Sequence, residues 1–342
     1  ASQAGDTTYN AASDKTFTVT VTEKSPYSDS FTTLALWLDG KDVNGDGLPE
    51  SSASFLAGGK VSAWSDRSGG SNTMSQGTSA NQPVYLSTGG GLSFDGTDDF
   101  LSAALPSAFA GNPGLTLFVV AETNATTSKR LVQLGDNAYG SAKILALHTK
   151  GTMAYANGNA LEGNYDFTST PTIGAWRRKS TDDTAGGDFF RNGEKKGLTA
   201  PSTTATLALP SSGSSILLAK GQGGTGWSSA QYFAGKVREV MLFTEDLSDY
   251  RIKRLEGYLA HKWGGAANLP AGHPFKSSAP SFGGSQSIET SSHTVPQVNG
   301  ASTLSLDIGA FSLEDYGIYA TSGLPISYVS SDTSVKIGRA HV

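Results

Sequence analysis

The sequence predicts an all-β protein, a sandwich or jelly roll of two antiparallel sheets with one short helix near its C-terminal end. Its 342 residues include 42 glycines, and only 16% of them are charged, below the roughly 25% of average domains. Short runs rich in Val, Ile, Phe and Tyr alternate with clusters of Gly, Asn and Ser. That alternation is typical of many short strands joined by turns.

Residues 32–280 are predicted to form the main domain, because turn residues separate a series of candidate strands across this range. These strands are Leu34–Trp37, Val61–Trp64, Val84–Leu86, Leu92–Phe94, Leu115–Ala121, Leu131–Leu134, Ile144–Leu147, Met153–Tyr155, Asp188–Arg191, Ile216–Leu218 and Val237–Phe243. The last of them is nearly all apolar, as expected of a central strand. Three tryptophans in patterned segments, Trp37, Trp64 and Trp263, are expected in the core.

One helix is predicted within residues 247–265. Ser248 is the expected N-terminal cap, and Gly264 supplies the C-terminal stop. Apolar residues recur between them at helical spacing, at Ile252, Leu255, Leu259 and Trp263. This amphipathic pattern predicts a helix that covers one end or edge of the sandwich.

The two ends are predicted to be partial domains, residues 1–30 and residues 281–336. Phe17–Val21 alternates apolar residues with threonine, which predicts one half-buried strand, and Ile326–Val329 predicts another. A single strand is not stable alone, so both need partners. Residues 337–342, IGRAHV, resemble a translated sequencing adapter and are expected to be a non-native tail.

A longer set of motifs resembles the laminin-G-like domains of large bacterial secreted proteins: LALWLDG, GKVSAWSDRSGG, GGLSFDGTDDFLS, TLFVVAE, FAGKVREVMLFTEDLSDYRIKRLEGYLAHKWG and LPAGHPF. The resemblance covers most of residues 32–280. It implies a concanavalin A-like jelly roll, adhesion or carbohydrate binding, and a structural Ca²⁺. The ends resemble the closing and opening halves of bacterial immunoglobulin-like repeats. That likeness implies that such repeats continue covalently on both sides in an extracellular, secreted or cell-surface parent protein.

Charge and hydropathy limit the partners. The net charge is -5, whereas nucleic-acid binding needs a basic face. No apolar stretch reaches the roughly 18 residues of a membrane span, so no membrane insertion is expected. The chain has no cysteine. A secreted domain without disulfides needs another staple, and Ca²⁺ is the expected one.

The segment Asp39–Glu50, DGKDVNGDGLPE, is the predicted calcium loop. Asp42, Asn44 and Asp46 occupy positions 1, 3 and 5 of a calcium-loop pattern, where alternate side chains converge on one point. A carbonyl of Leu48 and the side chains of Asp39 and Glu50 are expected to complete the shell. Position 12 is Ala53, so this is no EF-hand. The alternative is a polar turn that satisfies its own backbone.

A second acidic cluster lies in FDGTDDF, at Asp95, Asp98 and Asp99. Metal or sugar contact is one interpretation, and Asp98 and Asp99 are candidate ligand-binding residues. A turn with positive φ at Gly96 is the favoured alternative. Trp227, in the glycine-rich run 221–229, is a third ligand-binding candidate, because an aromatic ring on a loop can stack on a sugar. A tryptophan folded back over the sandwich edge is the alternative.

No catalytic site is predicted. Glucanases of related architecture need two carboxylates about 5 Å apart, at even spacing on one strand, and Glu239 has no acidic residue at +2 or +4. No Gly-x-Ser-x-Gly elbow and no HExxH metal pair occur. The leading hypothesis is a non-catalytic module that binds a glycan or cell-surface ligand. The alternatives are a structural spacer between immunoglobulin-like repeats and a glycan-active enzyme of the glucanase type.

Overall fold

The chain forms two compact units in the computed structural model, one comprising Thr33–Ala279 and the other comprising Ala1–Thr32 with Pro280–Val342. The structure describes residues 17–21, 33–46, 50, 59–125, 127, 129–135, 143–149, 151–156, 167–180, 187–197, 209–221, 231–280, 288–290, 318–320 and 326–330. The predicted calcium ligand Leu48 and the predicted sugar contact Trp227 lie outside these residues.

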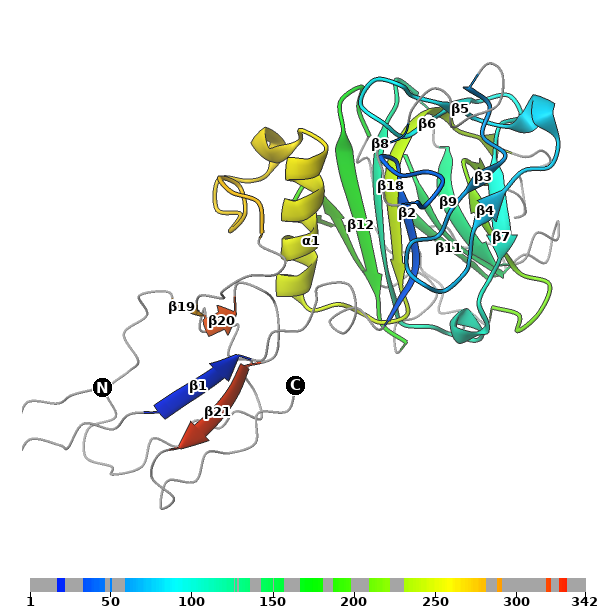
Figure 1. Ribbon diagram of the computed structural model, residues 1–342. Coiled ribbons are helices and arrows are strands. Elements are labelled where there is room, and N and C mark those ends of the chain that lie inside the picture. The colour runs from blue at the N-terminus through cyan, green and yellow to red at the C-terminus, as the bar shows by residue number, and fades with distance from the viewer. Residues whose placement is uncertain are drawn as a thin grey trace, which may run out of the picture. The chain divides into compact units, whose positions relative to one another are not determined.

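The unit Thr33–Ala279 is a sandwich of two antiparallel sheets with one helix near residue 250, which confirms the predicted mostly-β class (Figure 1). The seven-stranded sheet has the order β11 (Gly151–Ala156), β10 (Lys143–His148), β9 (Arg130–Gly135), β15 (Ser215–Leu218), β7 (Leu101–Ala104), β4 (Met74–Ser75), β3 (Ala63–Trp64). The eight-stranded sheet has the order β14 (Glu194–Lys196), β13 (Asp188–Arg191), β12 (Thr172–Arg178), β8 (Leu115–Glu122), β18 (Ala234–Phe243), β6 (Leu92–Asp95), β5 (Val84–Tyr85), and β2 (Leu34–Asp39) pairs with β18. A short hairpin joins β16 (Lys220–Gly221) to β17 (Gln231–Tyr232).

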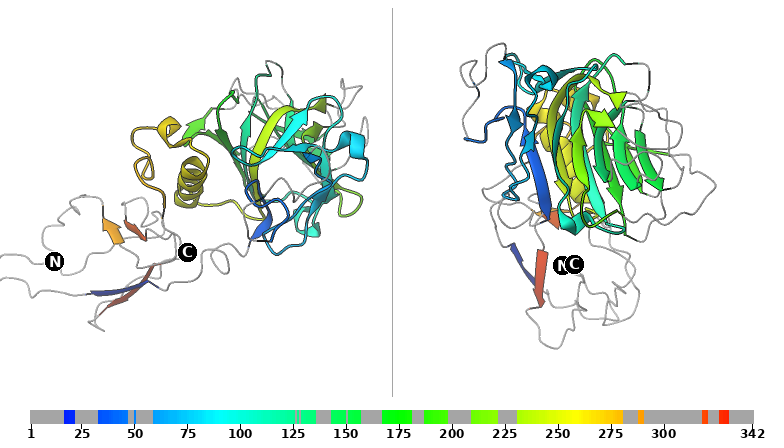
Figure 2. Two further views of the ribbon diagram at one scale, coloured as in Figure 1. Left: turned by 45° about the horizontal axis from the view of Figure 1, so that its top comes forward. Right: turned by 90° about the vertical axis from the view of Figure 1, so that its right-hand side faces the viewer.

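The main hydrophobic core lies between the two sheets. Figure 2 shows the two sheets from two further directions. Alternate residues of β8, Leu117, Val119 and Ala121, belong to this core, as the two-residue period of a strand requires. The intervening residues Phe118 and Val120 are buried as well. Both faces of this central strand are therefore covered, which explains why its sequence is almost uninterrupted in apolar residues.

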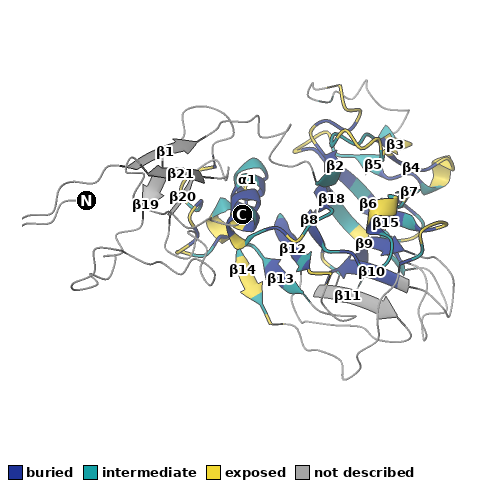
Figure 3. Ribbon diagram, turned by 90° about the horizontal axis from the view of Figure 1, so that it is seen from below, coloured by how far each residue is buried: buried dark blue, intermediate teal, exposed yellow. Residues whose placement is uncertain are grey.

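The helix α1 (Asp249–Lys262) packs against the eight-stranded sheet. It contacts β12, and its buried residues, dark blue in Figure 3, include Ile252, Leu255 and Leu259. The Oγ of Ser248 accepts a hydrogen bond from the backbone N–H of Arg251, which confirms the predicted cap. The helix lies against a face of the eight-stranded sheet, not only at an end of the sandwich. Within the described residues, no helix has the length and apolarity that a membrane crossing needs.

Several strands are absent from the sequence prediction, among them β4, β7, β12 and β14. The strand β12 contains Gly174, which disfavours a strand by itself. The packing explains the glycine, because a Cβ at this position would lie 2.5 Å from the Phe167 ring. Phe167 is 3% exposed and packs in the core. Local propensity therefore underestimates this strand, which tertiary contacts stabilise.

Two buried tryptophans give a matched test of this core. Trp64 is fully buried, and its Nε1 donates to the backbone oxygen of Asp39 at 3.1 Å. Trp176 is 1% exposed, and its Nε1 has no hydrogen-bond acceptor in the described structure. Since losing a made hydrogen bond costs more than removing an unpaired donor, Trp64→Phe should destabilise the fold by about 1–2 kcal/mol more than Trp176→Phe. Equal losses in urea unfolding would contradict this assignment.

The second unit contains two short antiparallel pairs. The strand β1 (Phe17–Val21) pairs with β21 (Ile326–Ser330), and β19 (Ile288–Thr290) pairs with β20 (Ile318–Ala320). The predicted strands at both ends of the chain are thus present, and they pair with each other. The division of these ends into two separate repeats stays a prediction.

Candidate functional site

The acidic loop between β6 and β7 brings three carboxylates together. One oxygen each of Asp95, Asp98 and Asp99 lies within 4.8 Å of the others, a spacing that could hold a metal ion. Gly96 has φ +81°, so the predicted turn with a positive φ is confirmed. The turn and a cation site are compatible, because carboxylate oxygens remain available beyond those that the backbone occupies.

Two of the three carboxylates, those of Asp95 and Asp99, differ in their electrostatics. Burial opposes ionisation of Asp95, but hydrogen bonds from the backbone N–H groups of Thr97, Asp98 and Asp99 outweigh it and hold the pKa of Asp95 below its usual value. Asp99 is 3% exposed, and burial raises its pKa. Lys60 lies 3.7 Å from its Oδ1. Asp95 is therefore the stronger acid of the two.

An aromatic pair borders this loop. The ring of Phe100, the residue after the acidic turn, lies 6.4 Å from the ring of Tyr232 on β17. The ammonium of Lys220 on β16 lies over both, 3.9 Å from the Phe100 ring centre and 5.6 Å from that of Tyr232. Burial lowers the pKa of Lys220. Both rings are half-buried, so each presents part of its surface at the edge of the sandwich.

We refer to this group as the rim site: Asp95, Asp98, Asp99, Phe100, Lys220 and Tyr232. The predicted sugar contacts Asp98 and Asp99 are part of it. Trp227 falls in the segment that connects β16 to β17, the hairpin that contributes Tyr232 and Lys220. The sequence prediction missed Phe100, Lys220 and Tyr232. Only Phe100 had a local signal, since it is the aromatic residue that closes the FDGTDDF motif.

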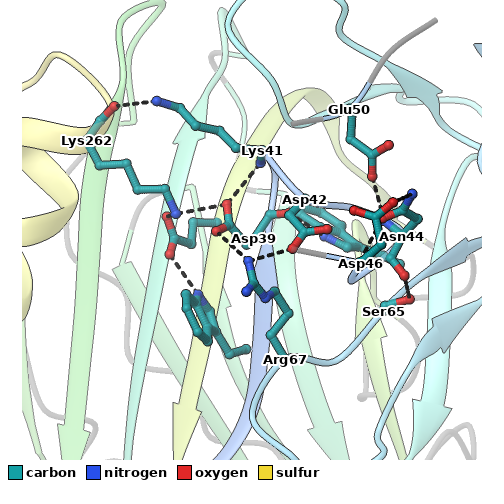
Figure 4. Close-up of polar contacts among 12 residues, drawn as sticks. Asp39, Lys41, Asp42, Asn44, Asp46, Glu50, Ser65, Arg67 and Lys262 are labelled. Carbon is teal, nitrogen blue, oxygen red and sulfur yellow. Dashed lines mark hydrogen bonds and ion pairs between the residues drawn. The ribbon is translucent and has the colours of Figure 1, made fainter. Parts of the chain in front are cut away.

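The predicted calcium loop lies elsewhere, after β2, and two of its acidic side chains are paired with protein cations (Figure 4). Arg67 Nη1 lies 2.6 Å from Asp42 Oδ2 and 3.6 Å from Asp39 Oδ2. Lys262 Nζ lies 2.8 Å from Asp39 Oδ1. These cations supply the positive charge that a calcium ion would otherwise bring to Asp39 and Asp42.

The other side chains of the loop bond to the backbone of the loop and to one another, as Figure 4 shows. The backbone N–H of Asn44 donates to Glu50 Oε1 at 2.6 Å, and that of Asp46 donates to Asn44 Oδ1 at 3.0 Å. Asn44 Nδ2 donates to Asp46 Oδ2 at 2.9 Å. Such contacts are expected of a polar turn that satisfies its own backbone, which was the alternative interpretation to a calcium loop.

Only some of the oxygen atoms of this loop are available as ligands for a calcium ion. Glu50 Oε2 is buried and has no hydrogen-bond donor in the described structure, so it is an orphaned oxygen of the kind that a cation satisfies. Asn44 and Asp46 add side-chain oxygens beside it. Asp39 and Asp42 do not fit while Arg67 and Lys262 occupy them. Calcium at this loop stays a prediction.

A buried charge cluster lies beneath the loop. Trp37 Nε1 and Trp263 Nε1 donate to the two oxygens of Glu239, at 2.8 and 2.6 Å. Lys262 Nζ lies 2.7 Å from Glu239 Oε2, and Glu239 is the cross-strand partner of Asp39. Burial raises the pKa of Glu239, the charge of Asp39 raises it further, and the Lys262 ammonium opposes both.

A bulge in β18 creates this arrangement. The register between β18 and β8 shifts between Val237 and Glu239, so Arg238 has no opposite residue on β8. A bulge redirects the side chains that follow it. Val240 consequently points into the main core, whereas Glu239 points toward Trp37 and the end of α1.

The pair Asp39 and Glu239 does not have the properties of a glycosidase site. A hydrolase needs one carboxylate free to attack and a second free to donate a proton. Glu239 is 1% exposed, and both of its oxygens accept hydrogen bonds. Its contacts are those of a structural group.

A pocket of about 410 Å³ opens beside this cluster. Its lining residues are Lys41, Glu50, Tyr85, Gly89, Gly90, Pro171, Arg238, Lys262 and Trp263. Three cations surround the Trp263 ring, with Lys41 and Lys262 ammonium groups 5.3 Å from its centre and the Arg238 guanidinium at 5.9 Å. Burial raises the pKa of Tyr85, and the charge of Glu50 adds to the effect.

Close backbone packing shapes one wall of this pocket. The backbone N–H of Gly40 donates to the Arg238 oxygen at 2.9 Å, and that of Gly91 donates to the Gly40 oxygen at 2.7 Å. A Cβ at Gly40 would lie 2.2 Å from the Arg238 oxygen. Only glycine permits this contact between the end of β2 and the bulge of β18.

Comparisons with known proteins give distant matches. No family model and no curated protein matches the sequence. A sialidase of Trypanosoma rangeli in complex with sialic acid has 14% identity and a TM-score of 0.44, covering 67% of this chain and 33% of the sialidase. The binding domain of botulinum neurotoxin DC, in complex with rat synaptotagmin II, has 10% identity and a TM-score of 0.43, covering 66% of this chain and 52% of that one.

A third solved structure is botulinum neurotoxin type C, whose cell entry is dependent upon interaction with two ganglioside molecules. It has 9% identity and a TM-score of 0.44, covering 66% of this chain and 51% of the toxin chain. The chain thus spans about a third of the sialidase and about half of the toxin structures. At these identities and TM-scores, the matches assign neither a ligand nor an activity to this chain.

Proposed function

We propose that this chain is a non-catalytic carbohydrate-binding or adhesive module of a large extracellular bacterial protein. In this proposal its sandwich is of the concanavalin A-like jelly-roll kind, and its ends are parts of immunoglobulin-like repeats that continue in the parent protein. The observation that carries the proposal is the rim site, where three clustered carboxylates border a pair of half-buried aromatic rings.

This combination suits a sugar. Aromatic rings offer an apolar face to the C–H side of a pyranose ring, and carboxylates accept hydrogen bonds from its hydroxyl groups. A cation held by Asp95, Asp98 and Asp99 would fix the loop and add positive charge for hydroxyl oxygens. Oxygen ligands of this type suit Ca²⁺. Trp227 would add a third ring from the hairpin that contributes Tyr232.

The test is a glycan-array screen of the chain with calcium and with a chelator. We expect calcium-dependent binding and a chelation-dependent drop in the melting temperature, because a ligand that binds only the folded state stabilises it. Asp98→Asn should weaken glycan binding, and the double variant Phe100→Ala with Tyr232→Ala should weaken it about ten-fold or more. Asp249→Asn, at an aspartate whose side chain is 68% exposed on α1, is the matched control.

The outcomes separate the alternatives. Binding that these rim variants leave unchanged would contradict the proposed site. No binding to any glycan would favour the structural spacer instead. If the chelator changes neither binding nor the melting temperature, calcium has no part in either.

A further inference from the structure

The pocket beside the end of α1 has cations at its surface and acids behind them. Lys41, Arg238 and Lys262 line it, with Glu50 as the one acidic residue in its lining. Its volume of about 410 Å³ is within the roughly 300–1,000 Å³ of small-molecule sites. The rim site contributes none of these residues, so the pocket is independent of the proposed glycan contacts.

Two of the cations are held rigidly. Arg238 Nε donates to Glu122 Oε1 at 2.8 Å, and Arg238 Nη1 donates to the backbone oxygen of Gly90. Lys262 contacts Asp39 and Glu239, at 2.8 and 2.7 Å. The three carboxylates that hold them do not line the pocket. A ligand in the pocket would therefore contact Arg238 and Lys262, which are already fixed in position, rather than the carboxylates that hold them.

The third cation has no carboxylate partner among the described residues. Lys41 is exposed, and its Nζ contacts the backbone oxygen of Lys262 at 3.4 Å, a long hydrogen bond. It also lies over the Trp263 ring. An ammonium group with spare N–H donors on a partly desolvated wall is suited to donate a charge-assisted hydrogen bond to an anion.

We propose that this pocket binds an oxyanion carried by a small polar ligand, namely the carboxylate or sulfate ester of an acidic sugar. Lys41 contacts the anion directly, and Arg238 and Lys262 provide a fixed positive wall. Glu50 lies in the same lining and opposes the anion. It therefore limits the affinity and makes binding sensitive to its own charge.

The probes are methyl glucuronide, glucose 6-sulfate and methyl glucoside, which share a pyranose ring and differ in charge. Calorimetric titration of the full chain, at low salt and with no divalent cation, separates this pocket from any calcium effect. We expect at least one of the two anionic sugars to bind about ten-fold or more tightly than methyl glucoside. The preference should fall as salt screens the exposed Lys41.

Two variants with opposite expected effects test the assignment. Lys41→Met should weaken anion binding about ten-fold, whereas Glu50→Gln should strengthen it about three-fold or more. Glutamine keeps the Oε1 that accepts from Asn44, so the wall is preserved. Lys195→Met and Glu194→Gln on β14, whose side chains are each 62% exposed, are the matched controls.

Binding of the neutral glucoside as tightly as both anionic sugars would overturn the proposal, as would a weaker anion affinity in Glu50→Gln. Absence of binding by all three probes would also overturn it. None of these results bears on the rim site, because the Asp98 and Phe100 variants test that site separately.

Discussion

Lys262→Met should lower the free energy of unfolding by about 3–5 kcal/mol at pH 8, because it leaves two buried carboxylates without their shared cation. The Lys262 side chain is 12% exposed, and that of Glu239 is fully buried. Asp39 keeps Arg67 as a partner, but only at 3.6 Å. Glu239 keeps its two indole donors and loses its only ion-pair partner among the described residues.

The loss should depend on pH. Burial raises the folded-state pKa of Glu239 above its ordinary 4.5. A raised pKa stabilises the fold fully below the unfolded-state value, and this contribution is lost as the pH rises through the folded-state pKa. Removing the ammonium raises the pKa of Glu239 further, so the carboxyl takes up a proton more readily. The deficit of Lys262→Met relative to the natural chain should therefore shrink as the pH falls from 8 to 5.

Urea unfolding at both pH values measures this difference. Lys253→Met is the control, because Lys253 lies on the same helix and is exposed. It should change stability by less than about 0.5 kcal/mol. A pH-independent loss in Lys262→Met would mean that packing of the lysine stem, not its charge, stabilises this end of α1.

The helix could be predicted from sequence because its determinants are local. The cap at Ser248, the apolar period and the glycine stop all lie within residues 247–265. The same holds for β8 and β18, whose apolar runs are long enough to exclude a turn. The turn at Asp95–Asp99 was likewise predictable, since the aspartate accepts hydrogen bonds from the backbone that follows it.

The buried cluster was not predictable, because its members meet only in the folded chain. Trp37 and Glu239 are separated by 202 positions in the sequence. The bulge at Arg238 leaves no signal in composition, yet it decides which face Glu239 occupies. Asp42 had the spacing of a calcium ligand, with Asn44 and Asp46, and Asp39 was expected to complete the shell. Sequence alone could not show that Arg67 and Lys262 would reach Asp39 and Asp42.

The rim site likewise combines residues that the sequence indicates with residues that only the fold brings together. Asp98 and Asp99 were candidates because acidic residues in a turn are visible in the sequence. Tyr232 and Lys220 join them through the β16–β17 hairpin, in a register that only the sheets establish. A surface assembled from separate strands has no sequence period of its own, so motif reasoning finds one part of it at a time.

Phe118→Ala should lower the free energy of unfolding by about 3–5 kcal/mol. Phe118 is fully buried on β8, between its antiparallel neighbours Ala175 and Met241. Its ring meets Phe243 edge to face, with centres 6.2 Å apart and planes at 80°. An aromatic pair in this geometry adds about 0.5–1.5 kcal/mol beyond its buried area. Urea unfolding monitored by circular dichroism measures the loss.

Phe100→Ala makes the matched control, since it removes the same atoms from a half-buried ring and should cost less than about 1.5 kcal/mol. The two variants separate stability from binding. Phe118→Ala should lower stability and leave the proposed glycan binding of the folded fraction unchanged. Phe100→Ala should weaken the proposed glycan binding and change stability much less. The almost uninterrupted apolar sequence of β8 implies that both of its faces are packed. If Phe118→Ala cost no more than Phe100→Ala, the face of β8 that carries Phe118 would not be packed.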